Sequence, residues 1–242
     1  MCREGNNEEL RYSIRSVVKN TPVRNVWVVG GKPEWYSGNF IPTKPVGNAY
    51  ENVRNNLRHV LANPEISEDF VLMNDDFFII RNVNSVSLYY GGLLNNRYKE
   101  HQELVGPNFY ANFLRKTDTA LKQMGIKQPL NYELHVPMPF NKTKLAETID
   151  QRFSIRSFYG NVHGLGGEDI VKDVKIYSHV SFVASSSTLD NGTPFVSTED
   201  GSFIQIKNYL ENLFPDQSPY ELPKLTSSYV ADNPTNSLLS GI

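Results

Sequence analysis

The run "FVLMNDDFFII" at residues 70–80 constrains the fold more than any other stretch of this 242-residue chain. Its apolar residues predict a core strand, "FVLM", that ends at Asp75 and Asp76. An unpaired charge is very costly to bury. Two adjacent carboxylates also raise each other's pKa unless a cation neutralises them. The run therefore predicts a strand that ends at a site where two like charges are compensated.

Helix and strand patterns alternate along the N-terminal part of the chain. Apolar residues at helical spacing predict helices over residues 6–20, with Asn6 as the N-cap, and over residues 48–61. A Val-rich strand is expected at residues 25–29, and Pro and Gly mark residues 39–47 as a loop. The order helix, strand, helix, strand is typical of an α/β domain in which helices connect parallel strands.

Length and composition favour one globular domain, with 39% hydrophobic and 21% charged residues. We expect this domain over residues 1–224 and a loosely ordered tail over residues 225–242. The net charge is −2 and the densest basic cluster, "RNNLRH" at residues 54–59, is thin, which argues against a nucleic-acid partner. One cysteine and the lack of an apolar stretch of ~18 residues predict a cytoplasmic protein without a membrane span.

The position of the acidic pair predicts a cation site. In α/β sheets, ligands bind at the carboxyl ends of the strands, where Asp75 and Asp76 are expected. Carboxylate oxygens suit Mg²⁺ or Mn²⁺, and such a cation commonly bridges to substrate phosphates. The alternative interpretation is a turn that caps the next segment.

Three further residues are candidates for chemistry. His135 lies in "HVPMPF", where two prolines hold the backbone extended, so it is a candidate general base; the alternative is a histidine that hydrogen-bonds a loop carbonyl. Arg156 is flanked by aromatic residues, so we expect it to be partly buried and to need a carboxylate or phosphate. Glu51 and Arg54 face away from the apolar stripe of their helix, and the plain interpretation of Glu51 is a solvated glutamate.

Several stretches resemble the Stealth family of hexose-1-phosphate transferases, which act in microbial polysaccharide synthesis. The similar stretches are "NNEELRYSIRSVVKNTPVRNVWVVGGKPEWY", "NAYENV", "ISEDFVLMNDDFF" and "HVPMPF". The closing "DGSFIQIKNYLENLFPDQSPYE" is similar to the end of related short proteins, some of them phage glycosyltransferases. The resemblance covers most of residues 5–222. The family's usual first region, a strand that helps to hold the nucleotide, has no counterpart here, which favours glycosyl transfer over sugar-phosphate transfer.

The resemblance implies roles for individual residues. Asp75 and Asp76 match the family's acidic pair and His135 its catalytic histidine. Arg156 matches an arginine of the phosphate site, and Glu51 matches the glutamate of a conserved helix. The resemblance also makes four other residues candidates for contacting the substrate, namely Arg11, Gly30, Gly31 and Asn74.

Together these observations predict an α/β fold with a single mixed, mostly parallel sheet and flanking helices, similar to GT-A nucleotide-diphospho-sugar transferases. The predicted function is Mg²⁺- or Mn²⁺-dependent transfer from a nucleotide-sugar donor to a saccharide or protein hydroxyl, by a bacterial or phage-encoded enzyme. Transfer of hexose 1-phosphate is one alternative, and a non-catalytic saccharide-binding module is another. A metal phosphoesterase would need more ligand residues than the sequence offers.

Overall fold

The acidic pair divides the apolar run into two strands that join different sheets of the computed structural model. Strand β3, Asp69–Leu72, pairs antiparallel with β6, Met138–Asn141. Strand β4, Phe77–Ile79, pairs antiparallel with β9, Phe195–Thr198. The pair lies in the turn between β3 and β4. A strand is present before the carboxylates, but the prediction of a core strand there is wrong: the residues of β3 alternate between exposed and half-buried, and Val71 is 44% exposed. Two residues, Met73 and Asn74, separate the end of β3 from Asp75, and the fully buried strand of the run is β4.

The structure describes residues 5–170, 174–178, 192–199 and 201–223, and these form one mixed α/β domain. The predicted tail at residues 225–242 lies outside this part of the chain. The remaining strands are β1, Trp27–Gly30; β2, Asn39–Pro42; β5, Tyr89–Tyr90; β7, Glu168–Asp169; and β8, Lys175–Ile176. Strand β2 occupies the first four residues of the predicted loop at residues 39–47, and the rest of that stretch is a loop.

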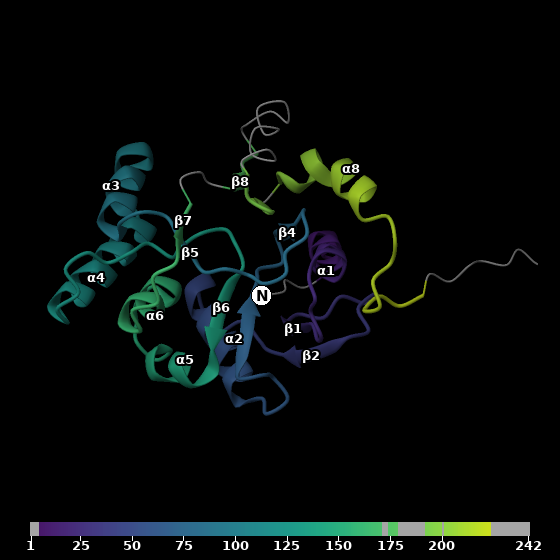
Figure 1. Ribbon diagram of the computed structural model, residues 1–242, viewed down its shortest axis with the longest axis horizontal. Coiled ribbons are helices and arrows are strands. Elements are labelled where there is room, and N and C mark those ends of the chain that lie inside the picture. Colours follow the sequence, from purple (N-terminus) through teal and green to yellow (C-terminus); the bar gives the residue numbers. More distant parts are fainter. Residues whose placement is uncertain (1–4, 171–173, 179–191, 200, 224–242) are drawn as a thin grey trace, which may run out of the picture.

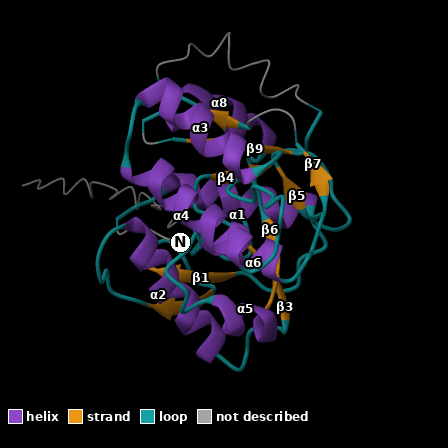
Figure 2. Ribbon diagram, turned by 90° about the vertical axis from the view of Figure 1, so that its left-hand side faces the viewer, coloured by secondary structure: helices purple, strands orange, loops and turns teal. Residues whose placement is uncertain are grey.

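The prediction of a single sheet is wrong for the described residues, whose strands form four small sheets, but the predicted mixture of mostly parallel and some antiparallel pairing is present. Strand β1 pairs parallel with β2, β5 with β7, and β8 with β9, whereas the other two pairings are antiparallel. Figure 2 shows the short strands lying among the helices rather than side by side in one layer. The physical reason is that turns interrupt the apolar runs, so each strand spans only two to four residues.

Seven helices of the described residues surround these strands. They are α1, Glu8–Asn20; α2, Ala49–Ala62; α3, Leu94–Val105; α4, Phe109–Gln123; α5, Lys142–Thr148; α6, Ile155–Val162; and α8, Phe203–Leu213. In Figure 1, α3 and α4 lie at one end of the longest axis, α8 lies toward the other, and β3 and β6 lie between them. None of the helices in the described ranges is both long and apolar enough to cross a bilayer.

Helix α1 begins one residue later than the sequence predicts. Its N-cap is Asn7, whose side chain accepts a hydrogen bond from the backbone N–H of Leu10, and not Asn6. The carbonyl of Asn6 instead accepts a hydrogen bond from the indole N–H of Trp35. Leu10 and Ile14 are buried, which confirms the predicted apolar face.

Helix α2 begins where the sequence predicts. Asn48 is the N-cap, and the side chain of Glu51 closes a capping box with it. Glu51 is exposed, as expected, but Arg54 is buried and donates hydrogen bonds to the carbonyls of Ile149 and Phe153. A long side chain on the polar face of a helix can reach across to a neighbouring segment, and periodicity alone does not reveal this.

Helix α1 also covers the free edge of β4. The backbone N–H of Ile79 donates to Oγ of Ser16 at 3.0 Å, and the Asn20 amide donates to the carbonyl of Ile79 at 2.5 Å. The backbone groups of Ile79 therefore have partners on α1, and the helix holds the strand that follows the acidic turn.

A buried ion pair fastens the middle of α1 to residues near the end of the described chain. Nε and Nη2 of Arg15 each donate to a carboxylate oxygen of Glu221 at 2.7 Å. Ser218 adds hydrogen bonds to the same carboxylate from its backbone N–H and its hydroxyl. Burial opposes ionisation of Glu221, but the hydrogen bonds from Arg15 and Ser218 hold its pKa below the usual value. The pair is therefore charged at neutral pH.

We predict that Glu221→Ala destabilises the fold by about 3–5 kcal/mol, because it leaves the buried guanidinium of Arg15 without its partner. The matched control is Asp150→Ala. Asp150 pairs with Arg58 at 2.7 Å, but their side chains are 74% and 50% exposed, so about 0–1 kcal/mol is expected. Urea unfolding measures both losses, and equal losses would contradict the argument.

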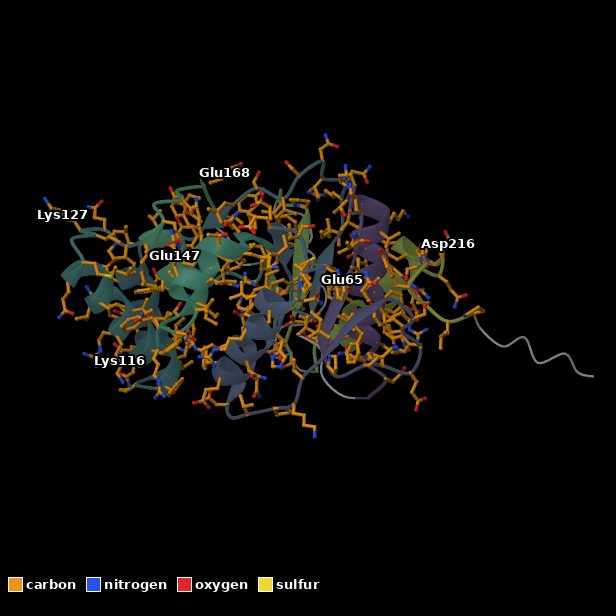
Figure 3. The ribbon with its side chains drawn as sticks, turned by 90° about the horizontal axis from the view of Figure 1, so that it is seen from below. Glu65, Lys116, Lys127, Glu147, Glu168 and Asp216 are labelled. Atoms are coloured by element: carbon orange, nitrogen blue, oxygen red, sulfur yellow. The ribbon has the colours of Figure 1, made fainter. Side chains whose placement is uncertain are left out.

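Charged side chains of both signs point outward around the molecule. Figure 3 shows Lys116 and Lys127 at the end formed by α3 and α4, and Asp216 at the opposite end. Glu65, Glu147 and Glu168 also lie on the exposed surface. The labelled charges are mixed in sign.

Candidate functional site

The antiparallel pairing of β3 and β6 brings the acidic pair and His135 to one edge. Leu72, the last residue of β3, lies opposite Met138, the first residue of β6. The residues that follow β3 and those that precede β6 therefore meet at the same end of the two strands. The sequence predicted that Asp76 and His135 belong to one site, and the strand register explains how the structure brings them together.

Asp75 is buried and is held by the start of helix α1. The side-chain amide of Asn7 donates a hydrogen bond of 2.7 Å to Oδ2 of Asp75. Asn7 is the N-cap of α1, so the carboxylate lies near the positive end of the helix. A helix N-terminus stabilises a nearby negative charge.

Asp76 has a buried oxygen without a partner. Its backbone carbonyl accepts a hydrogen bond from the N–H of Thr198 on β9, but Oδ1 has none among the described residues. Burial, and then the charge of Asp75, raise the pKa of Asp76 above its usual value. The positive charge of Lys175 opposes this rise, as does the imidazole of His135 when it is protonated, so both side chains lie in the electrostatic environment of Asp76.

Arg156 fixes the backbone around His135. The Nη1 atom donates hydrogen bonds to the carbonyls of Leu134, at 3.2 Å, and Val136, at 2.8 Å. These two residues flank His135, whose side chain is half-buried. Arg156 thus holds the general-base candidate in place from helix α6.

Arg156 is also next to the acidic turn, and its burial agrees with the prediction from the sequence. Its guanidinium lies over the ring of Phe77, 5.6 Å from the centroid. Burial lowers the pKa of Arg156, whereas the negative charges of Glu133 and Asp76 raise it. The guanidinium therefore helps to compensate the charge of Asp76.

Glu133, which was not predicted as a site residue, connects the His135 segment to α6 from the other side. Its Oε1 accepts hydrogen bonds from the hydroxyl of Ser154 and from the backbone N–H of Ser157, in the first turn of α6. A carboxylate at this place satisfies helix N–H groups that have no partner within the helix. The sequence signal that could have identified Glu133 is its position two residues before the candidate base His135.

Lys175 is a second residue that the sequence analysis missed. In the sheet of β4, β9 and β8, Lys175 lies opposite Ser197, and Ser197 lies opposite Phe77. This register places Lys175 two strands away from the residue that follows Asp76, and its charge lowers the pKa of Asp76. The local sequence holds no signal for this, because the strand pairing is long-range.

The other predicted residues lie at different places. Glu51 accepts a hydrogen bond from the backbone N–H of Asn48, so its carboxylate caps α2. The guanidinium of Arg11 lies over the ring of Trp35, 4.6 Å from the centroid, and its Nη1 is 3.4 Å from Glu221. Among the described residues, neither side chain hydrogen-bonds or pairs with Asp75 or Asp76.

The remaining three candidates are backbone features. Gly30 ends β1 with φ +121°, a conformation that side chains rarely adopt, and Gly31 follows it. Asn74 belongs to the acidic turn, where its carbonyl accepts a hydrogen bond from the N–H of Phe77 at 3.4 Å. Of these three, the structure therefore brings only Asn74 to the acidic pair directly.

Comparisons with known proteins leave these roles as predictions. A scan against protein-family models finds no family that matches the chain, and a search of curated proteins finds no matching relative. The resemblance to Stealth proteins and the roles that it implies thus stay predictions from the sequence.

The residues of the turn fit a cation that is shared with a substrate. The buried Oδ1 of Asp76 is an acceptor without a donor, which is what a hard cation would satisfy. No group of three or more His, Cys, Asp or Glu residues within the described ranges has metal-site geometry. Mg²⁺ is commonly held by one or two carboxylates together with substrate phosphates, so two aspartates suffice for this kind of site.

A separate hollow of about 480 Å³ lies between α4, α5 and α6. Met124, Glu147, Gln151 and Phe158 are among its lining residues, and none of the candidate site residues is. The chemistry that the acidic turn supports therefore does not extend into this hollow.

We predict that Asp76→Asn stabilises the cation-free protein at neutral pH. A raised pKa means that Asp76 binds its proton more tightly in the folded state. Protonated Asp76 therefore stabilises the fold below the pKa that Asp76 has in the unfolded chain, about 3.9. This stabilisation is lost as the pH rises through the raised pKa of Asp76 in the folded protein. In EDTA, the variant should melt at a higher temperature than the parent at pH 7, and the difference should shrink toward pH 4.

The control for this prediction is Glu65→Gln, which neutralises an exposed carboxylate. It should show no comparable gain at pH 7. A parent protein that is more stable than Asp76→Asn at pH 7 in EDTA would contradict the proposed cost of the Asp76 charge.

Proposed function

We propose that the protein is a cation-dependent transferase that uses a nucleotide-sugar donor and modifies a saccharide or protein hydroxyl. The observation that carries this proposal is the convergence of Asp76, His135 and Arg156 from three separate segments, with Oδ1 of Asp76 buried and unpartnered. An acceptor for a cation, a candidate base and a buried cationic side chain are the groups that transfer between phosphorylated sugars requires. A GT-A-like arrangement of the donor site is part of the same proposal.

Asp75 and Asp76 are the proposed ligands of Mg²⁺ or Mn²⁺. When bound, the cation supplies positive charge that stabilises the phosphates of the donor. Until donor and cation are present, the positive charges of Lys175 and Arg156 moderate the charge of Asp76. This explains how the fold tolerates a second carboxylate at a buried turn.

His135 is the proposed general base, and Arg156 positions it. A base takes the proton of the acceptor hydroxyl as the oxygen attacks the donor. The hydrogen bonds from Arg156 to the carbonyls on either side of His135 restrict the backbone, so the imidazole is held at the end of β3 and β6. The guanidinium also contributes positive charge close to the acidic pair.

We predict that His135→Ala lowers turnover by about 10²- to 10⁴-fold and leaves donor affinity nearly unchanged, because a base acts on the acceptor. Turnover is measured with an excess of acceptor, and donor affinity by calorimetry with Mn²⁺. The matched control is His59→Ala, which removes an exposed histidine of α2 and should keep full turnover. Unchanged turnover in His135→Ala would remove His135 from the proposed chemistry.

We also predict that Asp76→Asn abolishes Mn²⁺-dependent binding of a nucleotide sugar while the protein stays folded. The amide cannot supply the negative charge that the cation needs. Calorimetry with donor and Mn²⁺ measures the loss, and Glu65→Gln again serves as the control. Equal binding by Asp76→Asn and the parent would refute the assignment of the cation site.

The nucleotide that is released identifies the reaction. Attack of the acceptor oxygen on the anomeric carbon breaks the bond between sugar and phosphate and releases a nucleoside diphosphate. Attack on the phosphorus next to the sugar breaks the pyrophosphate and releases a nucleoside monophosphate. Chromatography of the products distinguishes glycosyl transfer from sugar-phosphate transfer. Saccharide binding without release of either nucleotide would favour the non-catalytic binding module.

A further inference from the structure

One side chain joins the N-terminus of α1 to the acidic turn. Oδ1 of Asn7 accepts a hydrogen bond of 3.1 Å from the backbone N–H of Leu10, and Nδ2 donates one of 2.7 Å to Oδ2 of Asp75. Both ends of the amide are used, and the cap determines which end faces the carboxylate. The amide nitrogen must therefore point to Asp75.

The backbone of Asn7 has an unusual conformation. Its φ of 38° and ψ of 69° are left-handed, and within the described ranges it is the one non-glycine residue with positive φ. Asn adopts this conformation more readily than most residues, but it still costs free energy and is concentrated at functional sites. The hydrogen bond from Trp35 to the carbonyl of Asn6 helps to hold this part of the backbone.

We propose that Asn7 is a positioning residue for the cation site, an inference that rests on the proposed function. Its amide holds Oδ2 of Asp75 and thereby orients this carboxylate, so that a cation would bind beside it at the unpartnered Oδ1 of Asp76. A neutral donor suits this role. A lysine would compete with the cation, and an aspartate would repel Asp75.

The chain contains a matched arrangement away from the site. Asn141 is the N-cap of α5, where Oδ1 accepts from the N–H of Lys144 at 3.1 Å and Nδ2 donates to Oδ1 of Asp69 at 2.9 Å. Its backbone is extended, with φ −109°, and Asp69 is exposed. The same pair of hydrogen bonds thus occurs once beside the acidic turn and once beside an ordinary surface aspartate.

The experiment compares Asn7→Gly with Asn141→Gly. Glycine accepts left-handed backbone and is a fair N-cap, so both variants should fold with similar, small decreases in melting temperature. Mn²⁺ affinity is measured by calorimetry on the full chain. Asn7→Gly should bind Mn²⁺ about 10- to 100-fold more weakly, as is typical when a residue that orients a metal ligand is lost. Asn141→Gly should bind Mn²⁺ as the parent does.

The outcomes separate this inference from the proposed function. If the parent and Asn7→Gly bind Mn²⁺ equally, Asn7 is only a helix cap, and the proposed function stands. If the parent binds no Mn²⁺ with or without donor, both the role of Asn7 and the proposed function are overturned. If Asn7→Gly does not fold, Asn7→Ser makes the same comparison, because its hydroxyl can cap α1 but is too short to reach Asp75. Equal loss of Mn²⁺ affinity in Asn141→Gly would also refute the inference.

Discussion

Asp75 and Asp76 repel each other in a buried turn, and the surrounding structure must compensate this repulsion. Neither carboxylate faces open solvent fully, so groups from distant segments compensate the two charges. Asn7 donates to Asp75, and the positive charge of Lys175 acts on Asp76. The compensation is incomplete, since an oxygen of Asp76 has no partner. A turn that lowers the stability of the cation-free protein is suited to a ligand that brings positive charge.

The local features were predictable from the sequence, and the long-range ones were not. The burial of Arg156 followed from its aromatic neighbours, and the range of α2 followed from the helical spacing of its apolar residues. The antiparallel pairing of β3 with β6 joins residues about 70 positions apart, so the sequence pattern predicted a mixed, mostly parallel sheet but not this pairing. Asn7 and not Asn6 caps α1, and the carbonyl of Asn6 accepts a hydrogen bond from Trp35, a contact that no local pattern reveals.

Two reciprocal contacts make helix α6 and the segment before β6 a single unit. Glu133 reaches from that segment to the first turn of α6, and Arg156 reaches back from α6 to the carbonyls beside His135. Prolines were the predicted source of rigidity here, yet Pro139 belongs to β6 itself. The position of His135 therefore depends on charged side chains whose burial also affects Asp76.

The ion pair between Arg15 and Glu221 also bears on how the chain folds during translation. The two residues are 206 positions apart, so Arg15 leaves the ribosome long before its partner is made. Until then, its guanidinium stays hydrated, because burying it alone would be unfavourable. Contacts of such high sequence separation form late and slowly. The docking of α1, and with it the hydrogen bond from Asn7 to Asp75, is thus expected to be completed only after residues 218–221 have emerged.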